Sequence, residues 1–168
     1  MDSRLEFIYA RRSVRRYASR QVSASDTRAL LEAGFSAPSA NDSRPCRFVV
    51  VTERDKLVRL SESFIHYKML AEASLAIVVC ADPARSPEYW VQDAAAATEN
   101  ILLAAAALDL GGVWLGVHPK EDRKDLIRDL LHIPKSIEVL SMACIGHPVE
   151  RMEPRARFED GWVHYENW

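Results

Sequence analysis

Residues 88–109 constrain the fold of this chain most strongly, because they read as one long and largely buried helix. The segment is rich in alanine and leucine, and Gly111 and Gly112 follow as its predicted end. Asp93 and Glu99 interrupt its apolar residues, and a carboxylate at bilayer depth costs roughly 2.5–3.5 kcal/mol on insertion scales. The segment is therefore typical of a helix in the core of a globular domain rather than of a membrane span.

The rest of the chain alternates between helix-like and strand-like segments. Apolar periodicity and capping residues predict helices at 5–12, at 24–37 and at 120–132, with one or two further helices in 54–73 that bend near His66. Strands are expected at residues 47–52, 75–81, 112–117 and 138–146. The first two strands are almost wholly apolar, which favours interior positions in a sheet.

Length and charge limit the classes of function. A chain of 168 residues suits one domain, so we expect residues 1–168 to fold together. The net charge of -2 gives no general field for nucleic acid. The first residues have neither a signal-peptide core nor the length of a membrane span, and we expect a cytoplasmic protein that binds neither nucleic acid nor membrane. Cys46, Cys80 and Cys144 are expected to be free thiols, with no metal site.

Residues 11–17, RRSVRRY, are a candidate anion site. They place four arginines around Ser13, just past the end of a predicted helix. The planar guanidinium matches the oxygens of a phosphate two at a time, and a serine hydroxyl can fill a remaining acceptor position. The alternative is a solvated basic face, which is common at helix ends on protein surfaces.

A second basic pair lies near the other end of the chain. Arg155 and Arg157 are two positions apart, so both side chains leave the same side of an extended segment. If the fold brings this pair beside Arg11 and Ser13, the four residues form a clamp for one phosphate dianion. The last segment, 154–168, has one strand-like run at 162–165 and two tryptophans, and packing on a partner subunit would cover them.

Two further segments suit a ligand with a flat ring. Residues 37–45, APSANDSRP, predict an ordered loop whose backbone a ligand can approach closely, or else a plain connector. Residues 110–116, LGGVWLG, contain three glycines, which favour positions where the backbone packs closely against a neighbouring group. There is no GxGxxG after a strand and no GxxxxGK[ST], so Rossmann and P-loop sites have no support. A thiol activated by Arg44 and Arg47 at Cys46 is a minor alternative.

Taken together, these segments resemble the nitroreductase family of FMN-dependent oxidoreductases over nearly the whole chain. The matching parts are an RRSxR-like stretch, a loop similar to PSxxNxQPW, a long alanine-rich helix that enters a GxGxxWxG-like strand, and a late basic pair. The resemblance implies an α+β fold of three layers, with a central mixed sheet flanked by helices. It also implies a homodimer that exchanges its C-terminal arm, about 154–168, and binds FMN at the subunit interface.

The resemblance also assigns roles to residues of this chain. Arg11, Ser13, Arg155 and Arg157 would hold the FMN phosphate. Arg12 and Arg15 would lie along the ribityl chain toward the pyrimidine edge, where the charge of Arg15 raises the flavin potential. The partner subunit would supply the loop residues Pro38, Ser39, Ala40 and Asp42. Leu115 and Gly116 would line the isoalloxazine ring, and no side chain is expected to be catalytic.

In the loop, Asp42, Arg44 and Cys46 stand where the family often has Asn, Gln and Trp. An ionised Asp42 would oppose Arg15 in setting the flavin potential, unless Arg44 neutralises it by pairing. The chain is also short for the family, which implies a reduced helical insertion over the pocket and a substrate site that is more open or has different walls.

The expected reaction takes hydride from NADH or NADPH through FMN to a nitroaromatic, a quinone or a similar small acceptor. The alternatives are a specialised flavoenzyme of the same fold, such as a dehalogenase, an oxidase or a flavin-modifying enzyme, and a noncatalytic flavin-binding dimer.

Overall fold

The computed structural model describes residues 2–168. The α-helices are α1 (Glu6–Ala10), α2 (Ala24–Phe35), α3 (Arg54–Ser63), α4 (Trp90–Ala107) and α5 (Glu121–Leu131). The strands are β1 (Cys46–Val51), β2 (Leu75–Ala81), β3 (Gly111–Gly116) and β4 (Glu138–Gly146). Short 3-10 turns lie at η1 (Ser3–Leu5), η2 (Ala40–Asp42), η3 (Ile65–Ala71) and η4 (Asp160–Trp162).

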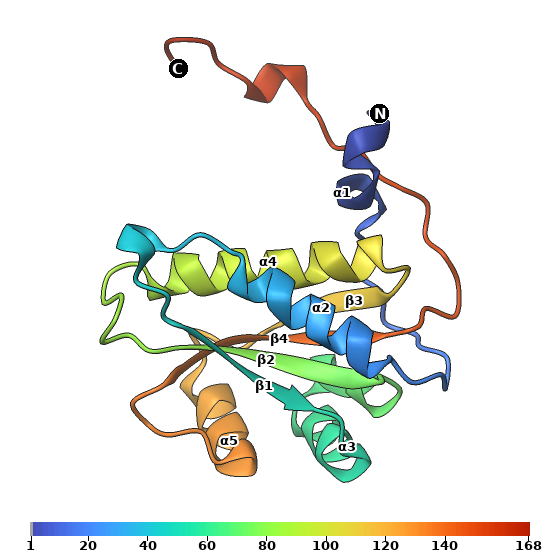
Figure 1. Cartoon of the computed structure of the whole chain (residues 1–168), viewed down its shortest axis with the longest axis vertical. Coiled ribbons are helices and arrows are strands. Elements are labelled where there is room, and N and C mark those ends of the chain that lie inside the picture. Colours follow the sequence, from blue (N-terminus) through green and yellow to red (C-terminus); the bar gives the residue numbers. More distant parts are fainter. Residues whose placement is uncertain (1) are drawn as a thin grey trace.

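Within residues 2–168 the four strands form one sheet in the order β1-β2-β4-β3 (Figure 1). All three neighbouring pairs are antiparallel. The α+β fold is confirmed, but the sheet is antiparallel where a mixed sheet was expected. Among the described residues, one isolated bridge outside the strands, between Ser13 and Gly112, is parallel. The expectation that the first strand is interior was also wrong, because β1 is an edge strand and its apolar residues pack against helices instead.

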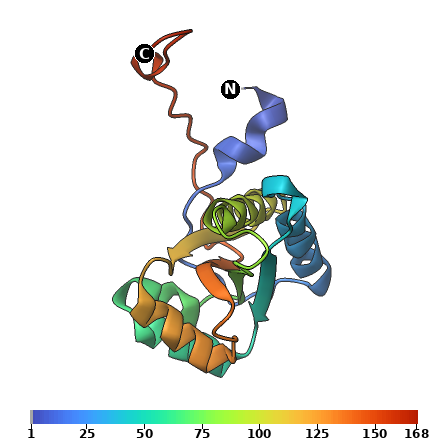
Figure 2. The same ribbon diagram turned by 90° about the vertical axis from the view of Figure 1, so that its left-hand side faces the viewer.

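Helices cover both faces of the sheet and give the expected three layers (Figure 2). On one face, Leu30 of α2 and Ile101 of α4 pack in a core with Ile77 and Val79 of β2. On the other face, α3, η3 and α5 enclose a second core that includes the intervening strand residue Val78. This alternation along β2 explains why the strand is apolar throughout, because each of its residues is buried on one face or the other.

The long helix lies close to the sheet because small residues face it. Ala94, Ala97 and Ala105 are fully buried, and the Thr98 hydroxyl lies 2.9 Å from the hydroxyl of Ser141 in β4. The helix ends at Ala107, and Asp109 then adopts a left-handed backbone with φ 57°. The turn at Asp109 therefore ends α4, whereas the glycines that were expected to end it begin β3. Across residues 2–168, no helix combines the length and the apolar character needed to cross a membrane.

Two glycines serve instead to seat the arginine-rich segment on the sheet. Gly111 and Gly146 are register partners across β3 and β4. A Cβ on Gly111 would lie 2.7 Å from Val14, and one on Gly146 would lie 2.8 Å from the Tyr17 ring. The Tyr17 hydroxyl donates to the Val14 carbonyl at 2.7 Å. The absence of side chains at these two positions thus allows residues 14–17 to cross the end of the sheet.

Both chain ends stand away from the body, where α1 and the C-terminal segment lie near each other (Figure 1, Figure 2). Every residue from 149 to 168 is exposed, and we call this segment the arm. The turn η4 at Asp160–Trp162 takes in the first residue of the strand-like run at 162–165, and Val163 is extended. Packing of this run on a partner subunit stays a prediction.

Candidate functional site

The two basic segments lie beside each other although they come from opposite ends of the chain. The backbone amide of Arg155 donates to the Tyr9 carbonyl at 2.9 Å. The Arg12 guanidinium donates to the Glu153 carbonyl. These two hydrogen bonds place the start of the arm next to the end of α1, and the phosphate clamp itself stays a prediction.

The predicted phosphate-site and ribityl-site residues differ in what they already contact. Arg11 forms an ion pair with Glu99 of α4, with 3.3 Å between Nε and Oε1. Arg15 is exposed, and its guanidinium lies 3.4 Å from the Ser13 carbonyl. Ser13 and Arg157 are also exposed. The structure therefore holds Arg11 and Arg12 in place and leaves Ser13, Arg15 and Arg157 facing solvent.

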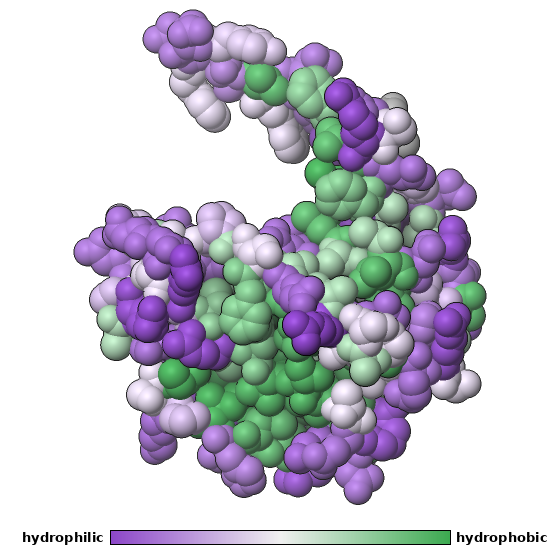
Figure 3. Space-filling model, viewed as in Figure 1, coloured by the Kyte–Doolittle hydropathy of each residue, from purple (hydrophilic) through white to green (hydrophobic). Residues whose placement is uncertain are grey.

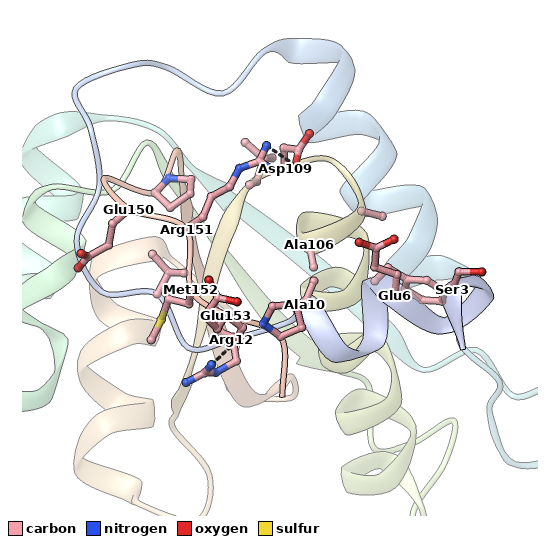
Figure 4. A pocket seen from close by; sticks show the side chains of 16 residues that line it. Ser3, Glu6, Ala10, Arg12, Ala106, Asp109, Glu150, Arg151, Met152 and Glu153 are labelled. Carbon is pink, nitrogen blue, oxygen red and sulfur yellow. Dashed lines mark hydrogen bonds and ion pairs between the residues drawn. The ribbon is translucent and has the colours of Figure 1, made fainter. Parts of the chain in front are cut away.

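A cavity of about 560 Å³ lies between α1, the end of α4 and the start of the arm (Figure 4). Its apolar lining includes Phe7, Leu110 and Met152, and Arg12 is the predicted site residue that also lines it. At its edge Arg151 pairs with Asp109 at 2.8 Å. Figure 3 shows that the last part of the chain extends away from the body and leaves a gap between them.

The end of β3 offers an open stretch of backbone. Among the described residues no atom lies within 4 Å of a Cβ built on Gly116. The Gly116 carbonyl accepts hydrogen bonds from the Tyr67 hydroxyl at 2.7 Å and from Arg123 at 2.9 Å. The Leu115 side chain is buried in the core, so it does not face the open space beside Gly116. Trp114 was missed, although period-two alternation places it on the same face as Gly116.

The loop between α2 and β1 has a strained backbone. Asn41, Asp42 and Arg44 adopt left-handed conformations, with φ of 54°, 50° and 49°. Such a conformation costs a residue other than glycine roughly 1–3 kcal/mol, least for asparagine. Asp42 and Arg44 form an ion pair, with 2.7 Å between Nε and Oδ1. The pairing proposed from the sequence is thus present, and it lowers the pKa of the Asp42 carboxyl.

Contacts from the loop itself and from α4 hold this conformation. The Ser39 hydroxyl accepts from the Arg44 amide at 3.0 Å. Asp93, buried in the first turn of α4, accepts from the Ala40 amide at 2.9 Å. The sequence reading treated Asp93 as an interruption of an apolar helix and missed this contact. A buried carboxylate in an alanine-rich helix was the available signal, because such a group needs a hydrogen-bond partner. Pro38 is exposed at the start of the loop.

The Cys46 thiol is not activated. Burial, and then the negative charge of Asp93, raise its pKa to about 11, although Arg47 acts in the opposite direction. The alternative of a reactive cysteine between Arg44 and Arg47 is therefore wrong. The Arg47 guanidinium instead donates to the Cys46 carbonyl at 2.8 Å.

Comparison with known proteins gives matches along the whole chain. The model of the Nitroreductase family matches residues 8–147. A protein of Archaeoglobus fulgidus with the provisional name NADH dehydrogenase/NAD(P)H nitroreductase is 47% identical over 174 residues, which cover 100% of both chains. The structure of an FMN-dependent nitroreductase of Clostridium difficile matches with a TM-score of 0.91 at 29% identity, covering 98% of this chain and 99% of that one.

A further solved structure contains the cofactor. It is a provisionally named nitroreductase of Desulfovibrio desulfuricans in complex with FMN, with a TM-score of 0.83 and 30% identity. The match covers 100% of this chain and 99% of that one.

Proposed function

The chain belongs to the nitroreductase family, and from this premise we propose that it passes electrons from NADH or NADPH, through bound FMN, to a nitroaromatic, a quinone or a similar small flat acceptor. The names of its relatives support the class of reaction and the cofactor. The acceptor and the residue assignments below are part of the proposal.

The proposed phosphate site consists of Arg11, Ser13, Arg155 and Arg157. The hydrogen bond between Arg155 and Tyr9 supports it, because it brings the arm to the residues just before Arg11. Charge-assisted hydrogen bonds from guanidinium groups suit a phosphate dianion. Arg12 and Arg15 would follow the ribityl chain.

The proposed ring site lies at the end of β3. The open space beside Gly116 fits the group, because a flat ring can approach backbone that carries no Cβ. When bound, FMN supplies the hydride and electron transfer, and the protein supplies position, charge and exclusion of water. No side chain of this chain is required as a nucleophile.

We propose a homodimer with FMN at its interface, and the positions of the proposed contacts along α4 bear on this. Ala40 is bonded to Asp93 near the start of the helix, whereas Arg12 lines a cavity together with Ala106 near its end. At 1.5 Å per residue these two helix positions are about 20 Å apart. As the resemblance to the family implies, we propose that the loop contacts from Pro38, Ser39, Ala40 and Asp42 come from the partner subunit. The exposed aromatic residues of the arm support the same arrangement.

The observation that carries the proposal is the meeting of the two basic segments, joined by the Arg155–Tyr9 and Arg12–Glu153 hydrogen bonds, in a member of this family. The test is an absorbance spectrum of the purified protein, followed by anaerobic addition of NADPH and, separately, NADH. We expect flavin bands near 450 nm, a general property of oxidised flavins, that bleach with at least one nicotinamide. A flavin that stays oxidised with both would favour the specialised flavoenzyme, and a protein that takes up no FMN would refute the proposal.

A further inference from the structure

We infer that Asp93 is a positioning residue, whose buried carboxylate holds the left-handed loop 39–44 in the conformation that presents Ser39, Ala40 and Asp42 to the flavin. The inference deepens the proposed function and rests on it for the identity of the ligand. Asp93 itself is not assigned any contact with FMN.

Both oxygens of the Asp93 carboxylate have a hydrogen-bond partner. Oδ1 accepts from the Ala40 amide at 2.9 Å, and Oδ2 accepts from the Ser86 hydroxyl at 2.7 Å. Asp93 is 5% exposed and Ser86 is 4% exposed. Ser86 therefore fixes the rotation of the carboxylate, so that Oδ1 points at the loop. Because water does not compete at a buried site, these hydrogen bonds are stronger than exposed ones.

The loop needs such a contact from outside. Asn41, Asp42 and Arg44 have positive φ angles, and residues in this region persist when surrounding structure over-determines them. The bond from Arg44 to Ser39 and the pair of Arg44 with Asp42 lie within the loop, so they move with it. Arg85 donates to the Ser43 carbonyl at 2.8 Å from outside, but its side chain is exposed. Asp93 is thus a buried hydrogen-bonding side chain that ties the strained backbone to the body.

The same helix also fixes the segment before the loop. The Asn100 side chain donates to the Ala33 carbonyl near the end of α2 at 3.0 Å. Asn100 is seven positions after Asp93, which is close to two turns, so both side chains leave the same side of α4. The end of α2 and the start of the loop are therefore both held by side chains of the same helix, α4.

The experiment compares Asp93→Ala with Asp93→Asn. An asparagine keeps an acceptor for the Ala40 amide and can donate to the Ser86 hydroxyl, whereas alanine removes both contacts. We expect Asp93→Ala to weaken FMN binding roughly tenfold or more and to speed amide exchange of residues 39–44 by a similar factor. Asp93→Asn should restore both to within roughly threefold of the wild type. FMN affinity is read from flavin fluorescence in a titration.

Thr98→Ala is the matched control. Thr98 is buried in the same helix and bonded to Ser141, and it faces the sheet instead of the loop. We expect it to lower the melting temperature and to leave FMN affinity and loop exchange unchanged. Equal weakening of FMN binding by Thr98→Ala and Asp93→Ala would show a merely structural role and overturn the inference. Unchanged FMN affinity in a folded Asp93→Ala variant would also overturn it.

The experiment also distinguishes failure of the proposed function from failure of the inference about Asp93, and it covers a variant that does not fold. If the wild type binds no FMN, the proposed function fails, while amide exchange of loop 39–44 without cofactor still decides whether Asp93 fixes the loop. If Asp93→Ala does not fold, Ser86→Ala replaces it, since it frees the carboxylate without removing it. That variant should weaken FMN binding by a smaller factor that exceeds the effect of Thr98→Ala, and an effect no larger than the control would overturn the inference.

Discussion

Gly111 and Gly146 pair directly across β3 and β4, and together they form the surface on which Val14 and Tyr17 lie. The arginine-rich segment is therefore positioned by the absence of two side chains. Two contacts of Tyr17 fix the C-terminal half of this segment. Its ring packs on Gly146, and its hydroxyl lies within hydrogen-bond distance, 3.0 Å, of the Cys144 carbonyl.

Gly146→Ala should destabilise the fold. Its Cβ would lie 2.8 Å from the Tyr17 ring, so the ring and the segment that carries it must shift. Overpacking of this kind costs about 1–3 kcal/mol in the free energy of unfolding, which urea denaturation measures. Gly161→Ala in the arm is the control, because among the described residues nothing lies within 4 Å of a Cβ there. Equal stability of the two variants would show that Tyr17 does not need the glycine.

Gly116→Ala should leave the stability of the fold nearly unchanged and weaken FMN binding. Its Cβ points into open space, so the stability of the fold should change by less than about 0.5 kcal/mol. If the isoalloxazine ring approaches this backbone, the added methyl group should weaken FMN binding. A fluorescence titration with FMN and a urea denaturation curve measure the two quantities. Unchanged FMN affinity would remove Gly116 from the proposed ring site.

Arg11→Ala and Arg157→Ala should each weaken FMN binding, because each removes a charge-assisted contact worth about 1.5–3 kcal/mol. Arg28→Ala, which removes an exposed arginine paired with Glu32 on α2, is the control for the change in net charge. The titration should be carried out at constant ionic strength. Flavin affinity equal to that of the control in both variants would refute the phosphate clamp.

Deletion of residues 158–168 should convert the proposed dimer into a monomer. The deletion removes Trp162 and Trp168, which are 83% and 101% exposed, and leaves Arg155 and Arg157 in place. Because association with a partner stabilises the folded chain, the shortened chain should also melt at a lower temperature than the dimer. Sedimentation equilibrium of the full chain and the shortened chain tests this. A shortened chain that stays dimeric would show that the interface does not need the arm.

Alkylation of Cys46 should be slow at pH 8 and should accelerate up to about pH 11, because the thiolate is the reactive form. Asp93→Asn should speed the reaction, since the charge of Asp93 helps to raise the pKa of the thiol. The raised pKa also contributes stability that is present below about pH 9 and is lost as the pH rises toward 11. Mass spectrometry of iodoacetamide adducts measures the rate. A maximal rate already at pH 8 would contradict the assignment.

Elements with strong local patterns could be predicted from the sequence. Residues 75–81 and 138–146 are strands with the predicted bounds, and residues 90–107 form the predicted long helix. Strand direction could not be predicted in the same way. The alternation of helices and strands fits parallel or antiparallel neighbours, and the choice depends on how each helix crosses the sheet, which the local pattern does not record.

In the candidate site too, features of the local sequence could be predicted, and contacts between distant residues could not. Arg11, Arg12 and Ser13 were singled out because charge and hydroxyl groups stand out in the sequence, and their roles stay predictions. The pairing of Asp42 with Arg44 is confirmed. The contact of Asp93 with Ala40 joins residues 53 positions apart, so no spacing rule reveals it. Leu115 was assigned to the ring site because the resemblance to the family implies it, yet strand alternation turns the Leu115 side chain into the core.

The pair of hydrogen bonds from α4 to the end of α2 and to the loop also sets how the chain tolerates insertions and deletions. One residue inserted between Asp93 and Asn100 turns one of these side chains about 100° away from its partner. A change of length within this part of the helix therefore breaks a contact even if the new residue is alanine. No contact of residues 158–168 depends on residue spacing along a helix in this way. We therefore expect homologues that differ in length to differ in the arm and not in the first half of α4.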